Sequence, residues 1–345
     1  MSNNFFTQKY VIQTVDPVHI GTGGMRLGRV DNSIVREPGT KLPKIPGTSL
    51  SGTLRHYAAY RYNKKQCAKQ KEHCGQTTCP ICYTFGWLKG NKSYGGVANI
   101  GDTRILFFPV YSMAGPIWVT SLSTLNDFGI NGQNVSDDKV QMSSGLSSYK
   151  HLNLGWLMVE KERELNLPDL PFILPDIVKN RIVLVSDKFF SQIVNSNLEV
   201  RTSVAINTDT GTAEDGALFT YEAIPRATYM WFELVVDDYR EQFPNYNRLL
   251  QWEKIITDST HDNKDALEIL KKADLPVSEN KFNASRDTIL DWIKEESIYK
   301  TKTTEIDTKK IINDGLDWLE HLGVGGMGTR GFGRIRKVPE VETIG

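Results

Sequence analysis

A carboxylate, Asp31, lies in a turn-rich stretch of the sequence shortly after two arginines, Arg26 and Arg29. A carboxylate among arginines can hold a divalent metal ion or orient a nucleophile, and it can equally be an ordinary salt-bridge partner. His19, at the end of a predicted strand, is suited either to act as a general base in RNA cleavage or to fill a structural role. The sequence contains no Ser-His-Asp spacing, Walker motif or H-E-x-x-H pattern.

All four cysteines fall within sixteen residues, in the order Cys67, Cys74, Cys79 and Cys82. In a chain expected to be cytosolic, such clustering indicates a metal site rather than disulfides. The Cys79–Cys82 pair has a usual zinc spacing, and His73 can replace one of the cysteines. A complete four-cysteine shell leaves no position for a catalytic water. We therefore expect a structural zinc ion that holds a loop in place. Four reduced thiols without metal are the alternative.

Two glycine-rich segments suit the binding of phosphate groups. The first precedes a predicted helix at residues 50–62 and offers hydroxyls and backbone N–H groups at the helix start, flanked by basic residues. Its candidate phosphate-binding residues are Lys44, Gly47, Thr48, Ser49 and Arg55. An ordinary capped helix is the alternative interpretation.

The second glycine-rich segment lies near the C-terminus and has five glycines between Gly325 and Gly333. Glycines let backbone N–H groups approach a phosphate, and arginines form forked hydrogen bonds with its oxygens. The candidate phosphate contacts in this segment are Gly325, Gly326, Thr329 and Arg330. A tight connection before a last strand explains the glycines equally well. The pattern also differs from the dinucleotide-binding fingerprint, because it follows a helix rather than a strand.

Charge is unevenly distributed, although the chain as a whole is neutral with 41 basic and 41 acidic residues. Residues 1–110 contain 15 Lys and Arg against 5 Asp and Glu, a net of +10, so the remainder has a net charge of −10. A basic N-terminal part predicts a surface that faces phosphates. A dipolar surface used for head-to-tail contacts between subunits fits the same distribution.

Hydrophobic periodicity predicts both strands and helices. We expect strands at residues 9–20, 97–110, 181–186 and 228–237, and helices at residues 50–62, 118–125, 187–194, 264–272 and 300–320. Two β-like runs around a glycine-containing loop predict a long hairpin over 199–225, whose return strand carries two further catalytic candidates, Tyr221 and Glu222. This order predicts an α+β fold with a ferredoxin-like (RRM-like) antiparallel sheet and helices on one face.

The length of 345 residues suits one elaborated domain or two small ones. We expect a single domain over 1–345 with two insertions, the Cys-rich stretch 63–95 and the hairpin 199–225. The longest apolar stretches are short, and the N-terminus lacks the pattern of a signal peptide. These features predict a cytoplasmic protein without membrane contact.

Together these pieces resemble the RAMP superfamily of CRISPR proteins. The closing glycine segment is similar to the signature loop of that family. The other similar stretches are His19–Gly23, Gly28–Glu37, Pro43–Arg55, Gly101–Ser112, Trp118–Thr120, Leu184–Arg201 and Thr212–Pro225. Several of them are most similar to the backbone subunits of Cmr (type III-B) complexes, whereas Gly328–Gly333 is also similar to Csm (type III-A) subunits. The Cys-rich stretch is absent from many Cmr backbone subunits.

The resemblance implies a subunit that stacks in several copies along a CRISPR guide RNA, beside other subunits of a type III effector complex. Arg201–Glu222 would be the thumb, a hairpin that displaces nucleotides of guide and target at regular intervals. Arg201 and the phosphate-binding candidates of both glycine-rich segments would be RNA contacts. The resemblance puts Asp31 at the position used for metal-dependent cleavage of target RNA, with Mg²⁺ or Mn²⁺ as the ion. A non-catalytic filament scaffold and, with His19 as base, a repeat-processing endonuclease are the alternatives.

Overall fold

The structure is a computed structural model that describes residues 5–23, 30–76, 79–132, 134–206, 209–238, 246–273, 275–294 and 307–341. Arg26 and Arg29, which the sequence places near Asp31, lie outside these ranges. The chain divides into two compact units, each discontinuous in sequence. Unit 1 comprises Met1–Gln8, Ser51–Ile100 and Leu234–Trp318, and unit 2 comprises Lys9–Leu50, Gly101–Glu233 and Leu319–Gly345. Elements are assigned below to the unit that holds most of their residues.

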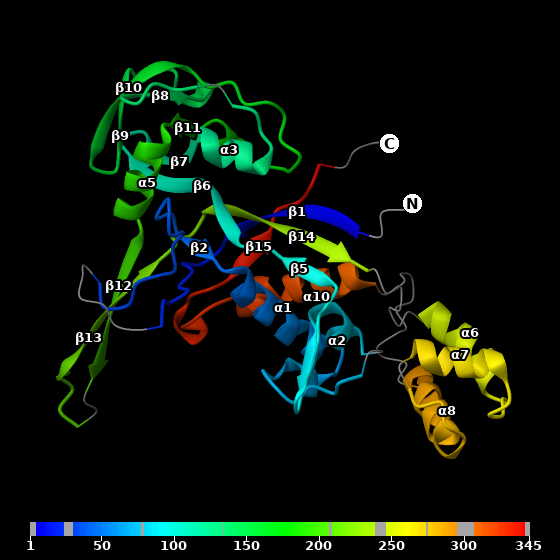
Figure 1. The fold of residues 1–345 in the computed structure, drawn as a ribbon. Coiled ribbons are helices and arrows are strands. Elements are labelled where there is room, and N and C mark those ends of the chain that lie inside the picture. The colour runs from blue at the N-terminus through cyan, green and yellow to red at the C-terminus, as the bar shows by residue number, and fades with distance from the viewer. Residues whose placement is uncertain are drawn as a thin grey trace. The chain divides into compact units, whose positions relative to one another are not determined.

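Unit 2 is built on a sheet with short helices between its strands (Figure 1). Its strands are β1 (Phe5–Thr14), β2 (Lys44–Ile45), β6 (Thr103–Ser112), β7 (Gly115–Ser121), β8 (Lys139–Met142), β9 (His151–Leu154), β10 (Leu157–Glu164), β11 (Ile182–Val185), β12 (Glu199–Ile206), β13 (Ala213–Ala223), β14 (Tyr229–Asp237) and β15 (Ile335–Lys337). Its helices are α3 (Leu122–Phe128), α4 (Asp176–Lys179) and α5 (Asp187–Ser196), with 3₁₀ turns η2 (Ser144–Leu146) and η3 (Gly328–Arg330).

The main sheet is mixed. Its strand order is β15-β1-β14-β6-β7-β11-β8-β10-β9, with β2 beside β6. Most neighbours are antiparallel, but β11 runs parallel to β7 and β10 runs parallel to β8. The predicted α+β class is confirmed, whereas the predicted antiparallel sheet is found only in part, because these two strand pairs are parallel. The reason is that the chain crosses from β7 to β11 through a long connection, which returns it to the sheet in the same direction.

Local sequence signals fix where the short helices begin and end. Helix α3 begins after Ser121, whose side chain accepts a hydrogen bond from the backbone N–H of Thr124, and it ends at Gly129, which has a φ of 97°. Helix α5 begins in the same way after Ser186. Such caps satisfy backbone groups that have no partner within the helix. They explain why residues 118–121, predicted as helix, instead complete strand β7.

Large apolar side chains from the strands, from α3 and from the chain between β10 and α4 form the core of unit 2. Phe107, Leu184 and Tyr229 are almost fully buried there. Phe128 packs edge-to-face on Phe172. Strands β8, β9 and β10 were not predicted, because residues 130–180 have little periodicity. Their backbone pairing is long-range, and it is not visible in local sequence.

Unit 1 is mainly helical. Its elements are α1 (Gly47–Arg61), the 3₁₀ turn η1 (Lys65–Ala68), α2 (Pro80–Phe85), β3 (Trp87–Lys89), β4 (Lys92–Tyr94), β5 (Ala98–Ile100), α6 (Tyr246–Ile256), α7 (Lys264–Lys272), α8 (Glu279–Lys294) and α10 (Thr308–Leu322). Helices α1 and α10 pack closely where Gly315 faces Leu54. A Cβ on Gly315 would lie 2.8 Å from Leu54 O, so the absence of a side chain there permits this close approach. The buried carboxylate of Asp314 also accepts a hydrogen bond from Tyr62 and forms an ion pair with Arg61 at 3.2 Å.

The predicted hairpin over 199–225 is present as the antiparallel pair β12–β13, which extends away from the main sheet in Figure 1. The predicted helix at residues 264–272 matches α7, whereas α6 and α8 were not predicted. Within the described part of the chain, no helix is both long and apolar enough to cross a lipid bilayer.

Candidate functional site

Two separate segments of unit 2 meet at the foot of the β12–β13 hairpin. The hairpin register pairs Thr202 with Thr220, and Asn32 forms an isolated parallel bridge to Tyr221. The backbone N–H of Asn32 donates to Thr220 O at 3.1 Å, and the N–H of Glu222 donates to Asn32 O at 3.0 Å. The segment that carries Asp31 is therefore fixed directly against strand β13.

The carboxylate of Asp31 is held through one oxygen. Its Oδ2 accepts hydrogen bonds from the backbone N–H and from the hydroxyl of Thr220, both at 2.8 Å, and Thr220 Oγ1 accepts from Asp31 N–H at 3.0 Å. These bonds, the backbone one first, hold the pKa of Asp31 below its ordinary value of 3.8. Among the described residues, Asp31 Oδ1 has no partner. It is a charged oxygen in a fixed direction, able to bind a cation or to orient water.

Glu222, two residues after Thr220 on strand β13, is buried, and both of its carboxylate oxygens have hydrogen-bond partners. Its Oε1 accepts from Arg36 Nη2 at 2.6 Å, and its Oε2 accepts from the backbone N–H of Ile34 at 3.3 Å. Arg36 in turn donates to Asn195 Oδ1 at 2.9 Å and to Ile34 O at 3.0 Å. The pair Arg36–Glu222 therefore locks the segment after Asp31 to the hairpin. The sequence did not indicate a role for Arg36, because its partner Glu222 is 186 positions away and no local pattern connects the two.

His19 also contacts Glu222, through the backbone of that residue. Its Nδ1 lies 2.7 Å from Glu222 O, an atom that can only accept, so Nδ1 carries a proton, and in the neutral ring Nε2 is an acceptor. The ring packs edge-to-face on Tyr221 with a centroid distance of 5.8 Å. His19 is only 7% exposed. The structure thus brings together four predicted candidates, Asp31, His19, Tyr221 and Glu222.

The C-terminal glycine segment lies against His19. The N–H of Gly326 donates to His19 O at 3.0 Å. A Cβ on Gly325, whose φ is 86°, would lie 2.5 Å from the same oxygen, so no side chain is tolerated there. Thr329 and Arg330 lie in η3 and are exposed. Their polar groups are therefore accessible to a ligand.

Arg201, at the start of the hairpin, also contacts the glycine segment. Its guanidinium lies 4.8 Å from the ring centroid of Phe332, and its Nε donates to Glu199 Oε1 at 2.6 Å. Arg334 forms an ion pair with Asp16, from Nη2 to Oδ1 at 3.0 Å. The hydrogen bond from Arg334, together with the charges of Arg226 and Arg201, holds the pKa of Asp16 below its ordinary value, so positive charge from three segments acts on this carboxylate.

The predicted anion site at the start of α1 already contains a carboxylate. Gly47 N–H donates to Asp102 Oδ1 at 2.7 Å, and Lys44 Nζ lies 2.5 Å from Asp102 Oδ2 and 3.2 Å from Glu37. The hydrogen bond to Asp102 raises the pKa of Lys44. Thr48 is exposed and Ser49 half-buried. The sequence indicated an anion site here, and the anion present belongs to the protein itself.

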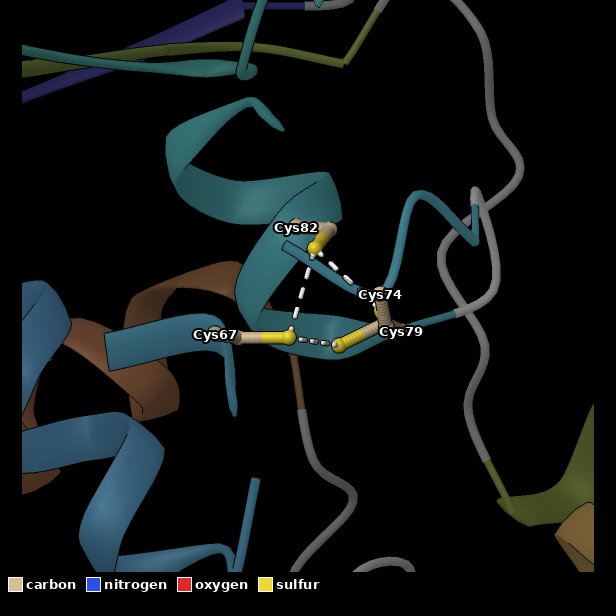
Figure 2. A group of neighbouring side chains, drawn as sticks. All are labelled: Cys67, Cys74, Cys79 and Cys82. Atoms are coloured by element: carbon tan, nitrogen blue, oxygen red, sulfur yellow. Dashed lines mark hydrogen bonds between the residues drawn. The ribbon is translucent and has the colours of Figure 1, made fainter. Parts of the chain in front are cut away.

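The four cysteines of unit 1 converge on one point, as Figure 2 shows. Sulfur atoms lie 3.8 Å apart for Cys67–Cys79, 3.5 Å for Cys74–Cys82 and 3.6 Å for Cys67–Cys82. Four sulfurs that surround a zinc ion tetrahedrally at about 2.3 Å are about 3.8 Å apart. The cluster is thus close to the size that such an ion requires. All four thiols are free.

His73 lies near the cluster, but both of its ring nitrogens have other partners. Nδ1 accepts from the N–H of Leu88 at 2.8 Å, and Nε2 lies 2.8 Å from Lys69 O. Arg55, predicted as an RNA contact, instead donates from Nε to Cys67 O at 2.7 Å. Burial lowers the pKa of Arg55, and the neighbouring cysteines oppose this effect. If the four cysteines held a metal ion, this guanidinium would offset part of the negative charge of the tetrathiolate.

Comparisons with known proteins agree with this architecture. A family model of the RAMP superfamily matches residues 11–336, so the chain belongs to the RAMP superfamily. The CRISPR system Cmr endoribonuclease Cmr4 of Pyrococcus furiosus is 29% identical over 247 residues, which are 65% of this chain and 80% of that protein. The Cms endoribonuclease Csm3 of Methanothermobacter thermautotrophicus is 33% identical over 81 residues, 23% of this chain and 32% of that protein.

Two solved structures have the same fold. A chain in the cryo-EM structure of type III-B Cmr-beta in the apo state gives a TM-score of 0.57 at 15% identity, with 98% of both chains covered. A chain in Cmr-beta bound to cognate target RNA gives a TM-score of 0.51 at 16% identity, with 67% of this chain and 84% of that chain covered. The predicted membership of the RAMP superfamily, with similarity to Cmr backbone subunits, is confirmed.

Proposed function

We propose that this chain is a backbone subunit of a type III-B CRISPR effector complex and that it cleaves target RNA complementary to the guide. Several copies stack along the CRISPR guide RNA with the other subunits of the complex, and each copy makes one cut. The cuts therefore recur at regular intervals. The Cmr endoribonuclease that is 29% identical to this chain supports the activity.

One observation carries the catalytic part of the proposal. Asp31 is fixed by two hydrogen bonds from Thr220 at the foot of a projecting hairpin, and its Oδ1 has no partner among the described residues. A carboxylate with a depressed pKa and a free oxygen is suited to hold a divalent ion, Mg²⁺ or Mn²⁺. The ion would neutralise charge that develops on the phosphate.

The other residues of the site have distinct roles in this mechanism. An A-form duplex holds the ribose 2′-OH out of line with the adjacent phosphate, so a nucleotide must leave the helix before its backbone can react. The hairpin β12–β13 acts as the thumb that displaces this nucleotide. In the neutral ring, which donates from Nδ1 to Glu222 O, His19 Nε2 accepts the proton of the attacking 2′-OH. The O2′–P bond forms as the P–O5′ bond breaks, and the leaving 5′ oxygen takes a proton from water. Tyr221 orients the His19 ring.

The test is an Asp31→Asn variant assembled into the guide-containing complex. Cleavage of complementary RNA should fall by about 10²-fold or more, because the substitution removes the charge that binds the ion. Target binding should be unchanged, since base pairing with the guide provides it. Asp138→Asn is the matched control, as Asp138 is an exposed carboxylate of the same unit. Gel analysis of labelled target measures both the rate and the spacing of the cuts.

Two other outcomes would each overturn the catalytic role of Asp31. Normal cutting by the Asp31→Asn complex would mean that this chain is a non-catalytic scaffold and that another subunit cuts. Metal-independent cleavage of CRISPR repeat RNA by the isolated chain, abolished by His19→Ala, would mean a repeat-processing endonuclease.

We propose one RAMP domain over residues 1–345, with a ferredoxin-like palm that carries the thumb at 199–225 and the Cys-rich insertion at 63–95. Backbone N–H groups and exposed polar side chains of the palm bind the guide. The proposed contacts are Lys44, Gly47, Thr48, Ser49, Arg55, Arg201, Gly325, Gly326, Thr329 and Arg330. The exposure of the η3 residues supports the last two. Asp102, which bonds with both Lys44 and Gly47, and the bond from Arg55 to Cys67 make Lys44, Gly47 and Arg55 the weakest of the set.

We also propose that Cys67, Cys74, Cys79 and Cys82 hold one structural zinc ion. The sulfur separations of 3.5 to 3.8 Å and the half-buried Arg55 guanidinium support it. Elemental analysis of the purified full chain should give one zinc per chain, and Cys82→Ser should lose it. His73→Gln is the control and should keep the metal, because both His73 nitrogens have other partners. A wild-type chain without zinc would remove this proposal.

A further inference from the structure

The Cys-rich lobe, defined here as residues 63–76 and 79–95, has a strong positive charge. Residues 63–95 contain six lysines and one carboxylate, Glu72, a net of +5 in a chain whose total is zero. A zinc tetrathiolate contributes −2 formal charges, so the lobe stays positive when it is loaded. The thiols are moreover mostly buried, whereas most of the lysines are exposed. The lobe therefore presents positive charge to its surroundings.

Four of these lysines are exposed and have no acidic partner within the described residues: Lys65, Lys69, Lys71 and Lys92. Glu72, the one carboxylate of the lobe, accepts a hydrogen bond from Gly90 N–H at 3.1 Å. Lysines on a surface are ordinarily interspersed with acidic residues that limit their mutual repulsion. A one-sided set of this kind is the electrostatic signature of a polyanion-binding surface.

Two like charges face each other across the small hairpin β3–β4. Its register pairs Lys89 directly with Lys92, and it pairs Trp87 with Tyr94. Like charges on directly opposite residues destabilise a strand pair. Lys89 also donates to Cys74 O at 3.0 Å, so it is held in place next to the metal cluster. An anion bound to this hairpin would relieve the repulsion, which makes phosphate a fitting ligand.

Aromatic rings lie beside the lysines. An open hollow of about 480 Å³ is lined by His56 and Tyr60 of α1 and by Lys65 and Lys69 of the lobe. The two rings are 4.7 Å apart, and Tyr60 is 44% exposed. Proteins that bind single-stranded nucleic acid combine cations for the backbone with aromatic faces on which bases stack. The hollow has both components.

We propose that the Cys-rich lobe is a second RNA-binding surface, which contacts the phosphate backbone of single-stranded RNA independently of guide pairing. The zinc site fixes the loop that presents the lysines, and His56 and Tyr60 offer a stacking face. The proposal rests on the proposed RNA-guided function for the nature of its ligand. It does not depend on the catalytic role of Asp31.

The test compares three zinc-loaded full-length chains in binding to labelled oligouridylate across a series of salt concentrations. In the lobe variant, Lys65, Lys69, Lys71 and Lys92 are replaced by Gln. In the matched control, four exposed lysines elsewhere are replaced: Lys150, Lys179, Lys188 and Lys281. The lobe variant should bind about tenfold or more weakly at low salt. The magnitude of its slope of log K against log salt should fall by about 0.7 for each phosphate that the lobe no longer neutralises. The control should retain the wild-type slope.

A second measurement separates stacking from charge. Tyr60→Leu keeps an apolar side chain but removes the ring, and it should weaken binding without changing the salt slope. Zinc content measured on every variant establishes that the lobe is intact. Wild-type affinity and slope in the lobe variant would overturn the proposal. So would an unchanged RNA affinity together with a loss of self-association, which would identify a protein-docking surface instead.

The outcome is distinguishable from failure of the proposed function. If the lobe variant binds RNA normally and cutting by the complex depends on Asp31, only the second RNA-binding surface is refuted. If the lobe variant binds RNA weakly but the Asp31→Asn complex cuts target RNA normally, only the catalytic assignment is refuted.

Discussion

At the scale of single residues, Thr220 gives Asp31 its properties. A threonine hydroxyl has one proton to donate and can accept at the same time, and Thr220 Oγ1 does both, toward Asp31 Oδ2 and from Asp31 N–H. The backbone N–H of Thr220 adds a second donor to the same oxygen. One side chain thereby fixes the orientation of the carboxylate and favours its charged form. Local sequence contains no sign of this pair, because 189 positions separate its members.

The depressed pKa of Asp31 leads to a prediction about pH. Because the pKa lies below 3.8 in the folded protein, Asp31 stays ionised above pH 5. Its bonds with Thr220 stabilise the fold above about pH 3.8 and are lost only as the pH falls through the folded-state value. Cleavage between pH 5 and pH 8 should therefore not follow the protonation of Asp31. NMR titration of aspartate carboxyl carbons measures the midpoint.

Thr220→Val is the matched variant for this titration. It removes the hydroxyl and keeps the backbone donor, so the midpoint of Asp31 should rise only part of the way toward 3.8. The midpoint of Asp102, whose carboxylate bonds with Lys44 and Gly47 instead, should not move. An Asp31 midpoint at or above 3.8 in the unmodified protein would contradict the hydrogen-bonded geometry.

At the scale of elements, the pair Arg36–Glu222 ties the Asp31 segment to strand β13. Glu222 side-chain exposure is 10%, and that of Arg36 is 24%. Both carboxylate oxygens of Glu222 have partners, and its backbone O accepts from His19. Removal of one partner would leave a poorly solvated charge without compensation. Such an ion pair specifies the register between the two segments, which a merely apolar contact would not do.

Glu222→Gln should destabilise the protein by about 2 kcal/mol, because Arg36 loses its ionic partner in a half-buried place. Urea unfolding measures this change. The control is Glu160→Gln, whose exposed ion pair with Lys139 should contribute no more than about 0.5 kcal/mol. Cleavage should fall together with stability, since Asp31 loses its support. Full stability with abolished cleavage would instead mean that Glu222 acts directly on the RNA.

At the scale of the whole molecule, the stacked arrangement makes a prediction about mixed assemblies. If each copy cuts the phosphate beside its own Asp31, then complexes assembled from wild-type and Asp31→Asn chains should cut at unchanged positions. The yield at each position should fall in proportion to the fraction of wild-type chain. Gel mapping of the products measures both quantities. Complete loss of cutting with a small fraction of variant would mean that neighbouring copies share one site.

Charge is the other property of the whole chain that bears on function. The basic excess of residues 1–110 is concentrated partly in the Cys-rich lobe, with its six lysines. Part of the rest is neutralised inside the protein, as with Lys44 at Asp102 and Arg36 at Glu222. A count of charges along the sequence thus indicates a phosphate-facing surface but overestimates the number of free cations.

The sequence by itself determined what depends on local pattern. It was sufficient for the family, the α+β class, the hairpin at 199–225, helix α7 and the cysteine cluster, because turn signals, periodicity and short spacings act over a few residues. It failed for β8 to β10, where pairing between distant segments outweighs weak local preference. It also assigned Trp118–Ser121 to a helix that begins only at Leu122.

Only the tertiary structure decided which groups meet. Thr220 reaches Asp31, Arg36 pairs with Glu222, and Asp102 occupies the helix start that the sequence offered to a phosphate. Long-range contacts of this kind depend on strand register, which places a side chain on one face or the other and is set by the whole sheet. For that reason the residue types of the site were readable in advance, whereas their partners and their remaining free atoms were not.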